Sequence, residues 1–203
     1  MKRIWLILAA IFLSAAIAAA SPIDFRDELT FGGALDQTSF STTVDGLGLA
    51  FTPSPSGATL WWDDQDGIGV QFDYEQDEIE GDELLELNFS MEVYVAEIYI
   101  SDLFNEWGYR EFGAYRLDDQ PLWNPFFADE DQLIGATNGE LTLLVGEWAD
   151  TITFWAPGII GNQNHDFAVA GVNVDPVPIP GSAILLGSGI LALLGIVRRR
   201  RNS

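Results

Sequence analysis

The sequence predicts an all-β domain over residues 21–174, built as an antiparallel β-sandwich of the jelly-roll type. Apolar residues alternate with polar ones at a period of two in short runs, which is the pattern of strands with one buried face. Turn residues such as Gly, Pro, Asn and Asp separate these runs. Helix signals are scarce, so about eight to ten short strands without a long helix favour two packed antiparallel layers.

The alternation is clearest in the first half of the domain. Leu, Val, Phe and Tyr occupy every second position in residues 47–51, 70–74 and 85–89. A further run over 91–100 changes phase at Ala96, which predicts a β-bulge. Later strands are expected around residues 141–143, 152–154 and 167–174. Gly171 allows a second change of phase in the last of them.

Local patterns predict what joins the strands. Asn138 and Gly139 form a preferred pair for a tight turn with positive φ, so residues 131–145 are the strongest hairpin candidate. Residues 101–106 predict one helical turn, which Ser101 caps. Eight acids between residues 73 and 86 are typical of a solvated hairpin tip and its outer face.

The domain is strongly acidic. Between residues 21 and 180, Arg26, Arg110 and Arg116 face all 31 Asp and Glu residues, which gives this segment a net charge of −28. Such a surface repels phosphate backbones, so nucleic-acid binding is excluded. Cysteine is absent, which removes disulfides, thiolate zinc sites and cysteine nucleophiles. Because 48% of the chain is hydrophobic, the acidity does not imply disorder.

Residues 1–20 are predicted to be a secretory signal peptide. Lys2 and Arg3 precede an apolar run over residues 4–17, and three alanines end at Ala20. Cleavage after Ala20 satisfies the requirement for small residues before the cut. The alternative is an uncleaved amino-terminal anchor, and the alanine-rich end argues against it.

Residues 175–203 predict a linker, a membrane helix and a basic tail. Residues 175–181 carry prolines at alternate positions, which favours a stiff extended stalk. The apolar stretch from Ile179 to Val197 approaches the roughly 30 Å hydrocarbon thickness at about 1.5 Å per residue, so residues 182–203 are assigned to the transmembrane helix and its tail. The tail ends in Arg198, Arg199, Arg200 and Arg201. These arginines stay on the cytoplasmic face, which places the acidic domain on the far side.

The C-terminal residues resemble a known class of sorting signal. The motif is Val177-Pro178-Ile179-Pro180-Gly181, followed by a glycine-interrupted apolar helix and the arginine run. It resembles the PEP-CTERM family in its Val-Pro-x-Pro variants, with Ile179 in place of the name-giving Glu. The resemblance implies recognition of Pro178 and Pro180 by an exosortase, which processes the protein for surface display or release, in a polysaccharide or biofilm setting. It implies nothing about the acidic domain.

One acidic turn suggests a calcium site. Asp64 and Asp66 are one residue apart and precede Gly67, and Ca²⁺ binds six to eight oxygens around such turns. Trp62 occupies the place of the first EF-hand ligand, so that motif fails. A non-EF site would add a distant carboxylate, such as Asp118 or Asp119. The alternative is a solvated acidic turn without a metal.

The aromatic residues suggest a carbohydrate site. Sugar-binding sandwiches stack pyranose rings on exposed indoles beside carboxylates and amides, although tryptophan in a sandwich is more often in the core. The aromatic candidates are Trp61, Trp62, Trp107, Tyr109, Trp123, Trp148 and Trp155.

Catalysis fits the sequence poorly. His165 is the one histidine, and neither a Ser-His-Asp triad nor a histidine metal centre can be assembled around it from the spacing of other residues. We therefore expect no catalytic residue, and we expect His165 in a loop that leads into a strand.

We expect an exported, non-enzymatic cell-surface or extracellular-matrix protein. Signal peptidase and the exosortase would process it, the inner membrane would hold it transiently through the C-terminal helix, and extracellular polysaccharide is a suggested partner. One alternative is a carbohydrate-binding or calcium-dependent adhesion module that the tail only delivers. Another is a glycan hydrolase, which needs a cleft with two carboxyls roughly 5–10 Å apart.

Overall fold

The computed structural model describes residues 21–72, 78–81, 83–106, 109–129, 139–157 and 165–176. The signal peptide, the sorting motif at 177–181 and the C-terminal helix with its arginines lie outside these residues, as does the first part of the hairpin expected over 131–145. Within the described ranges, no helix has the length and apolar character needed to cross a membrane.

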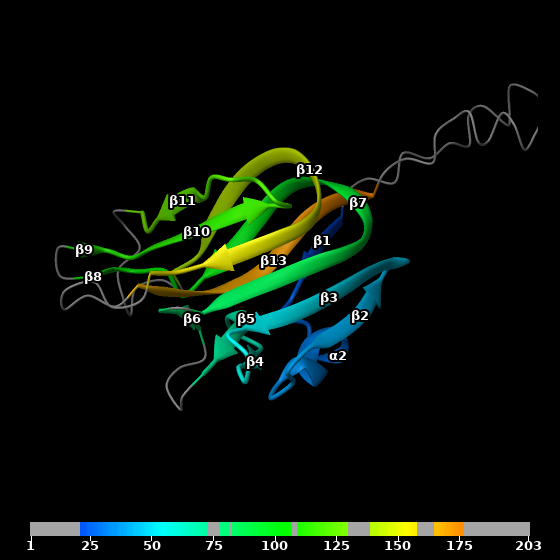
Figure 1. Cartoon of the computed structure of the whole chain (residues 1–203), viewed down its shortest axis with the longest axis horizontal. Coiled ribbons are helices and arrows are strands. Elements are labelled where there is room, and N and C mark those ends of the chain that lie inside the picture. The colour runs from blue at the N-terminus through cyan, green and yellow to red at the C-terminus, as the bar shows by residue number, and fades with distance from the viewer. Residues whose placement is uncertain are drawn as a thin grey trace, which may run out of the picture. The chain divides into compact units, whose positions relative to one another are not determined.

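Strands form most of the described chain (Figure 1). Eleven of them form one antiparallel sheet: β1 (Ser21–Asp24), β2 (Phe40–Val44), β3 (Leu47–Ser54), β4 (Thr59–Asp63), β5 (Gly67–Gln71), β6 (Ile79–Glu80), β7 (Leu84–Ser101), β10 (Phe112–Leu117), β11 (Asn124–Phe127), β12 (Leu141–Trp155) and β13 (Asp166–Pro176). A separate pair joins β8 (Asn105–Glu106) to β9 (Tyr109–Arg110). One short helix, α2 (Glu28–Phe31), precedes a 3₁₀ turn at Gly32–Ala34.

Two long strands hold the sheet together. β12 pairs with β7 along almost its full length. The other edge of β7 pairs with β3 in its first half and with β13 in its second half. β7 and β12 therefore belong to both layers of a curled sheet, with β2 and β3 on one side of β7 and β10 and β11 on the other (Figure 1). The expected all-β, sandwich-like architecture is confirmed, and the finer assignment to the jelly-roll type stays a prediction.

The core lies between these layers. Leu85 and Leu87 of β7 and Ile152 and Phe154 of β12 are fully buried, as the period-two pattern predicts for one face of a strand. Phe25 and Phe51 pack edge to face at 5.1 Å between ring centroids. The remaining core residues are apolar side chains from both layers, and they form one continuous cluster.

Both predicted changes of phase are β-bulges. In the pairing of β7 with β13, Ala96 is the extra residue. The pairing of β7 with β12 also shifts there, and Val145 and Gly146 of β12 lie opposite Ala96. The pairing of β13 with β7 passes over Ala170, directly before Gly171. A side chain at Gly171 would clash with the carbonyl oxygen of Ile23, so the glycine permits the close approach of β1.

Three sequence expectations differ from the structure. Ser101 caps no helix: it ends β7, and its hydroxyl donates to the carbonyl oxygen of Asp66 at 2.5 Å. Glu83 lies in the acidic run expected at a solvated tip, but it is 5% exposed. β13 continues through Asp175 and Pro176, the first two residues of the expected linker, because they pair with Tyr94 and Val93 of β7.

Candidate functional site

Four strands present a row of polar side chains on the outward face of the sheet. Arg116 of β10 pairs with Thr153 of β12, and Thr153 pairs with Glu86 of β7. Thr52 of β3 extends the row beyond Glu86. Paired residues on neighbouring strands point to the same face, and the adjacent positions supply the buried core. The row therefore lies on the side away from the core.

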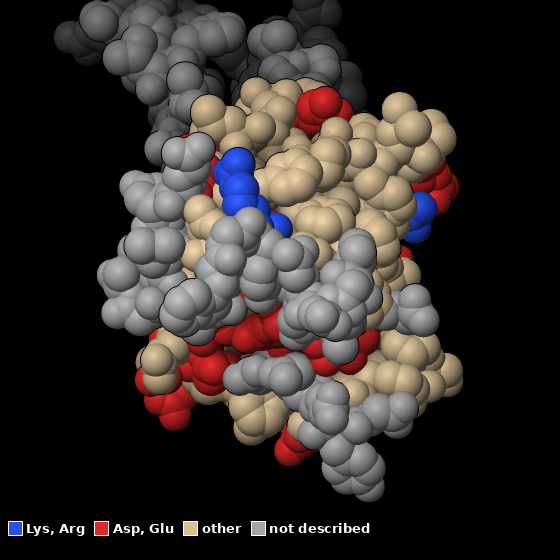
Figure 2. Space-filling view, turned by 90° about the vertical axis from the view of Figure 1, so that its left-hand side faces the viewer, with Lys and Arg blue, Asp and Glu red and all other residues tan. Residues whose placement is uncertain are grey.

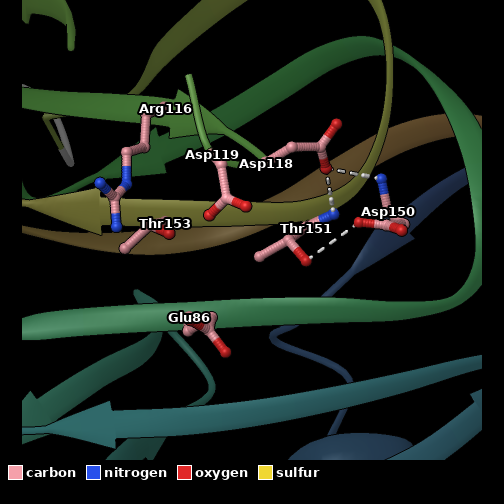
Figure 3. Close-up of a pocket in the computed structure, with 7 residues that line it drawn as sticks. All are labelled: Glu86, Arg116, Asp118, Asp119, Asp150, Thr151 and Thr153. Atoms are coloured by element: carbon pink, nitrogen blue, oxygen red, sulfur yellow. Dashed lines mark hydrogen bonds between the residues drawn. The ribbon is translucent and has the colours of Figure 1, made fainter. Parts of the chain in front are cut away.

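A polar pocket lies on this row. Its volume is about 160 Å³. Figure 3 shows Glu86 on β7, below β12, and Arg116 on β10, above β12. The lining residues are Glu86, Arg116, Asp118, Asp119, Asp150, Thr151 and Thr153.

Asp118 fixes one end of the pocket. It follows β10 with a φ of 48°, and its amide donates to the carbonyl oxygen of Thr151 at 2.9 Å. Its Oδ1 accepts from the backbone amides of Asp150 and Thr151, each at 3.0 Å (Figure 3). The pairing of β12 with β7 is interrupted here, since it passes over Asp150 on β12 and residues 89–92 on β7. The Asp118 carboxylate thus satisfies an amide that this interruption takes out of the ladder.

Side-chain contacts hold the middle of the pocket. The Thr151 hydroxyl lies 2.9 Å from Oδ1 of Asn88 and 3.3 Å from Oδ1 of Asp150. Nδ2 of Asn88 donates to Oε1 of Glu86 at 2.8 Å. These contacts connect Asp150 on β12 with Glu86 on β7. The polar groups are therefore positioned before any ligand arrives, which lowers the entropic cost of binding.

Two tryptophans flank the Arg116 end of the pocket. The Arg116 guanidinium carbon lies 4.9 Å from the centre of the Trp123 ring, within the range of a cation–π contact. Trp123 in turn lies 5.8 Å from Trp155 of β12, between ring centroids. Nε of Arg116 is buried and has no hydrogen-bond partner among the described residues. The site thus combines indole rings, a guanidinium donor and several carboxylate acceptors.

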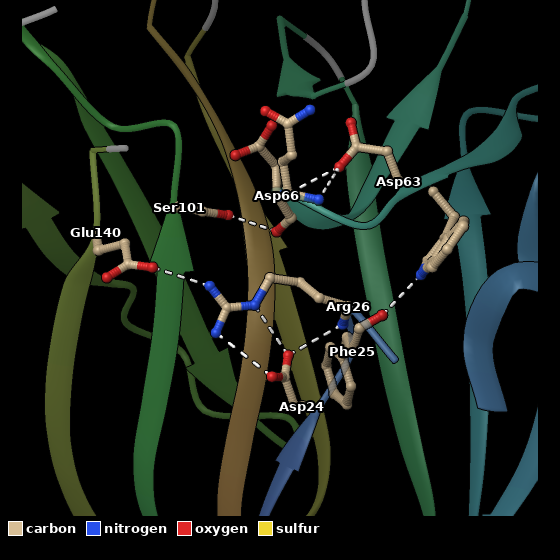
Figure 4. Close-up of polar contacts among 9 residues, drawn as sticks. Asp24, Phe25, Arg26, Asp63, Asp66, Ser101 and Glu140 are labelled. Carbon is tan, nitrogen blue, oxygen red and sulfur yellow. Dashed lines mark hydrogen bonds and ion pairs between the residues drawn. The ribbon is translucent and has the colours of Figure 1, made fainter. Parts of the chain in front are cut away.

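The side chain of Asp63 holds the acidic turn at residues 63–67 by accepting hydrogen bonds from backbone amides of the turn. Oδ1 of Asp63 accepts from the amides of Gln65 at 2.8 Å and Asp66 at 2.7 Å (Figure 4). Asp118 and Asp119, the distant ligands considered for Asp64 and Asp66, line the pocket with Asp150 and Glu86. Among the described residues, no group of three or more acids and histidines is arranged to hold a metal ion. Calcium at Asp64 and Asp66 stays a prediction.

The other aromatic candidates lie elsewhere. Trp62 packs against the core, and its indole donates to the carbonyl oxygen of Phe25 at 2.7 Å. Trp148 is 46% exposed and contacts Tyr94, with 5.3 Å between ring centroids. Trp61 is half-buried on β4, Trp107 lies outside the described residues, and the side chain of Tyr109 is not described. Of the aromatic candidates, Trp123 and Trp155 are the two that the structure brings next to the pocket.

His165 lies directly before β13, as expected from the sequence. It is 4% exposed, and its ring centroid lies 4.5 Å from that of Phe112. Burial lowers the pKa of the imidazole below its usual value. A buried neutral imidazole packed on a phenyl ring is a core residue in this structure.

A second group of acids gathers where β6 and the start of β13 meet. Figure 2 views this end of the molecule and shows acidic side chains in a band across it. Burial, a hydrogen bond with Asp102 and the charge of Asp166 raise the pKa of Glu78. Burial is also the main cause that raises the pKa of Asp166 to about 6. These carboxyls therefore hold protons more tightly than exposed acids do.

Comparison with known proteins identifies no family. No protein-family model matches the chain, and no curated protein matches it. A solved chain described as "X-ray structure of GH31 CBM32-2 bound to GalNAc" is similar over 62% of this chain and 97% of that chain, at 12% identity and a TM-score of 0.33. A TM-score of 0.33 is too low to establish a shared fold.

Sequence reasoning missed most of the pocket. Glu86, Thr153 and Asp150 come from segments up to 67 residues apart, and only the strand register brings them together. Arg116 did carry a signal, since an isolated arginine on a strand is unusual in a domain with 31 acids.

Proposed function

We propose that this chain is an exported, non-enzymatic carbohydrate-binding protein whose ligand occupies the pocket between Arg116 and Glu86. The observation that carries the proposal is the position of two indole rings beside a pocket lined entirely by polar side chains. Sugars present apolar C–H faces to aromatic rings and hydroxyl edges to charged groups, so a site of this composition suits them.

The geometry supports binding. Oε1 of Glu86 and Oδ1 of Asp118 both accept hydrogen bonds from other protein groups. These contacts hold the two carboxylates in place, which suits the binding of a ligand's hydroxyls. The rest of the lining supplies two hydroxyls, a guanidinium and the carboxylates of Asp119 and Asp150, which are groups that can hydrogen-bond to a sugar.

Delivery to the surface is part of the same proposal. The signal peptide would export the chain, and Pro178 and Pro180 with Arg198 to Arg201 would direct it to an exosortase. A sugar-binding domain released outside the cytoplasmic membrane would meet extracellular polysaccharide directly. The resemblance to PEP-CTERM signals supports this step, and the pocket supports the binding step independently.

The binding step is tested by calorimetry on the full-length chain in a detergent without a sugar headgroup. A panel of neutral oligosaccharides should include a ligand that binds with saturable heat. Trp123→Ala should weaken that binding by about 1 kcal/mol, or roughly fivefold, because it removes the ring that supports Arg116 and the sugar.

Trp148→Ala is the matched control, since it removes an indole that lies on β12 outside the pocket. It should leave the affinity unchanged. Saturable binding that is lost in Trp148→Ala and kept in Trp123→Ala would place the site elsewhere, and the absence of heat with every glycan would refute carbohydrate binding.

A further inference from the structure

We propose that the pocket selects sugars rich in hydrogen-bond donors, binding protonated amino sugars more tightly than neutral sugars and rejecting acidic ones. This inference rests on the proposed function and adds the class of ligand. It follows from the kinds of polar group in the lining, from their charges, and from the place of the one cation among them.

The lining is dominated by acceptors. Glu86, Asp118, Asp119 and Asp150 contribute carboxylates, which only accept hydrogen bonds when ionised. Among the described residues, protein groups hydrogen-bond to Oε1 of Glu86 and to Oδ1 of Asp118 and Asp150. The second oxygen of each carboxylate takes no part in those bonds. A ligand that fits must therefore bring donors, which hydroxyl and ammonium groups provide.

The balance of charge points the same way. The pocket holds four carboxylates against the single guanidinium of Arg116. An ammonium group inside it gains attraction, whereas a carboxylate or sulfate is repelled and must also lose its hydration. The surrounding domain, with 31 acids, adds repulsion of the same sign over roughly a Debye length of 8–10 Å.

Arg116 sets the direction of the ligand. Its guanidinium lies against Trp123, so the single cation of the pocket is at the tryptophan end. Asp118 holds the other end through the hydrogen bonds that it accepts from the backbone amides of Asp150 and Thr151. A sugar ring would present an acceptor oxygen toward Arg116 and its donor groups toward the carboxylates. An amino group on the donor side would meet the carboxylates directly.

The test compares β-1,4-linked oligosaccharides of equal length made of glucosamine, N-acetylglucosamine, glucose or a uronic acid. Calorimetry on the full-length chain at low salt and about pH 5.5 keeps the sugar amines charged and most carboxylates ionised. We expect glucosamine oligomers to bind at least fivefold more tightly than the two neutral oligomers, and the uronic acid oligomer to show no binding.

Asp119→Asn and Asp150→Asn each remove one negative charge from the lining. Each should reduce the preference for glucosamine about two- to fivefold, which is the range for a single exposed ion pair. Asp45→Asn is the control for charge alone. Asp45 is exposed in the β2–β3 turn, does not line the pocket, and has a φ of 50° that asparagine tolerates. It should leave the preference unchanged.

The outcomes separate this inference from the function on which it rests. If a neutral oligomer binds and the uronic acid oligomer binds equally or more tightly, the proposed selectivity is overturned. Carbohydrate binding itself would then still hold. No binding of any oligomer overturns both. An equal loss in Asp45→Asn and in the two pocket variants would show general attraction to an acidic protein and would overturn the assignment to this pocket.

Discussion

Glu83 is a carboxylic acid held inside the domain. It is 5% exposed, and Oε2 accepts from the amide of Glu80 at 3.0 Å. Burial outweighs this hydrogen bond and raises the pKa of the carboxyl from 4.5 to about 8. Near neutral pH the folded protein therefore binds a proton at Glu83 that the unfolded chain has lost.

The stability of the domain should accordingly decrease as the pH rises. The contribution of Glu83 is fully present below its unfolded pKa of 4.5 and is lost as the pH passes through about 8. Asp166, raised to about 6, acts in the same direction at lower pH. Thermal unfolding should show a melting temperature several degrees higher at pH 5.5 than at pH 8.5.

Glu83→Gln isolates the contribution of this residue. Glutamine can accept the same amide hydrogen bond without ionising, so the variant should depend less on pH between about 5 and 8 and should be the more stable protein at the upper end. A steeper pH dependence in the variant than in the parent protein would contradict the buried, protonated carboxyl.

At the scale of elements, the β4–β5 turn joins the hairpin to β13. Gly67 begins β5 with a φ of 101°, and a Cβ there would lie 2.5 Å from the carbonyl oxygen of Val169. The same turn receives the Ser101 hydroxyl on the carbonyl oxygen of Asp66 (Figure 4). Backbone approach of this closeness requires glycine.

Gly67→Ala should destabilise the domain by about 2–4 kcal/mol, from positive φ together with the clash against β13. Gly46→Ala is the matched control, because Gly46 has a φ of 86° and nothing lies within 4 Å of its Cβ position. It should cost only about 1–2 kcal/mol. Urea unfolding measures both, and equal losses would show that contact with β13 contributes nothing.

Elements whose signal is local were predictable from sequence. The phase slip at Ala96 appears in the apolar pattern itself, and both neighbouring strands pass over that residue in the structure. Ser101 was misread because its hydroxyl has a distant partner, the carbonyl oxygen of Asp66, that competes with a local helix cap. The spacing of residues in a sequence can indicate a local hydrogen bond such as a helix cap. It cannot indicate a hydrogen bond to a distant residue such as Asp66.

At the scale of the molecule, the site depends on register between distant strands. Trp123 and Trp155 were among the aromatic candidates, but nothing local distinguishes them from Trp62, which packs against the core. Pairing of Arg116 with Thr153 and of Thr153 with Glu86 requires β7, β10 and β12 to align. The class of fold follows from alternation, whereas the pocket follows from the global alignment of long strands.

The whole-chain proposal also predicts the behaviour of the C-terminal arginines. Replacing Arg198 to Arg201 with neutral residues should weaken membrane retention and processing, because these charges would fix the orientation of the apolar segment. Immunoblots of membrane and extracellular fractions measure this effect. An unchanged processed product in the extracellular fraction would contradict the sorting step and leave the pocket unaffected.

The most direct test of the central claim is NMR of the tryptophan indole N–H signals in the full-length chain during titration with a glucosamine oligomer. We predict saturable shifts at Trp123 and Trp155, which lie beside Arg116 and the pocket, and constant signals at Trp62 and Trp148. Constant signals at Trp123 and Trp155 while another indole responds, or constant signals throughout the titration, would contradict the claim that this outward pocket binds carbohydrate.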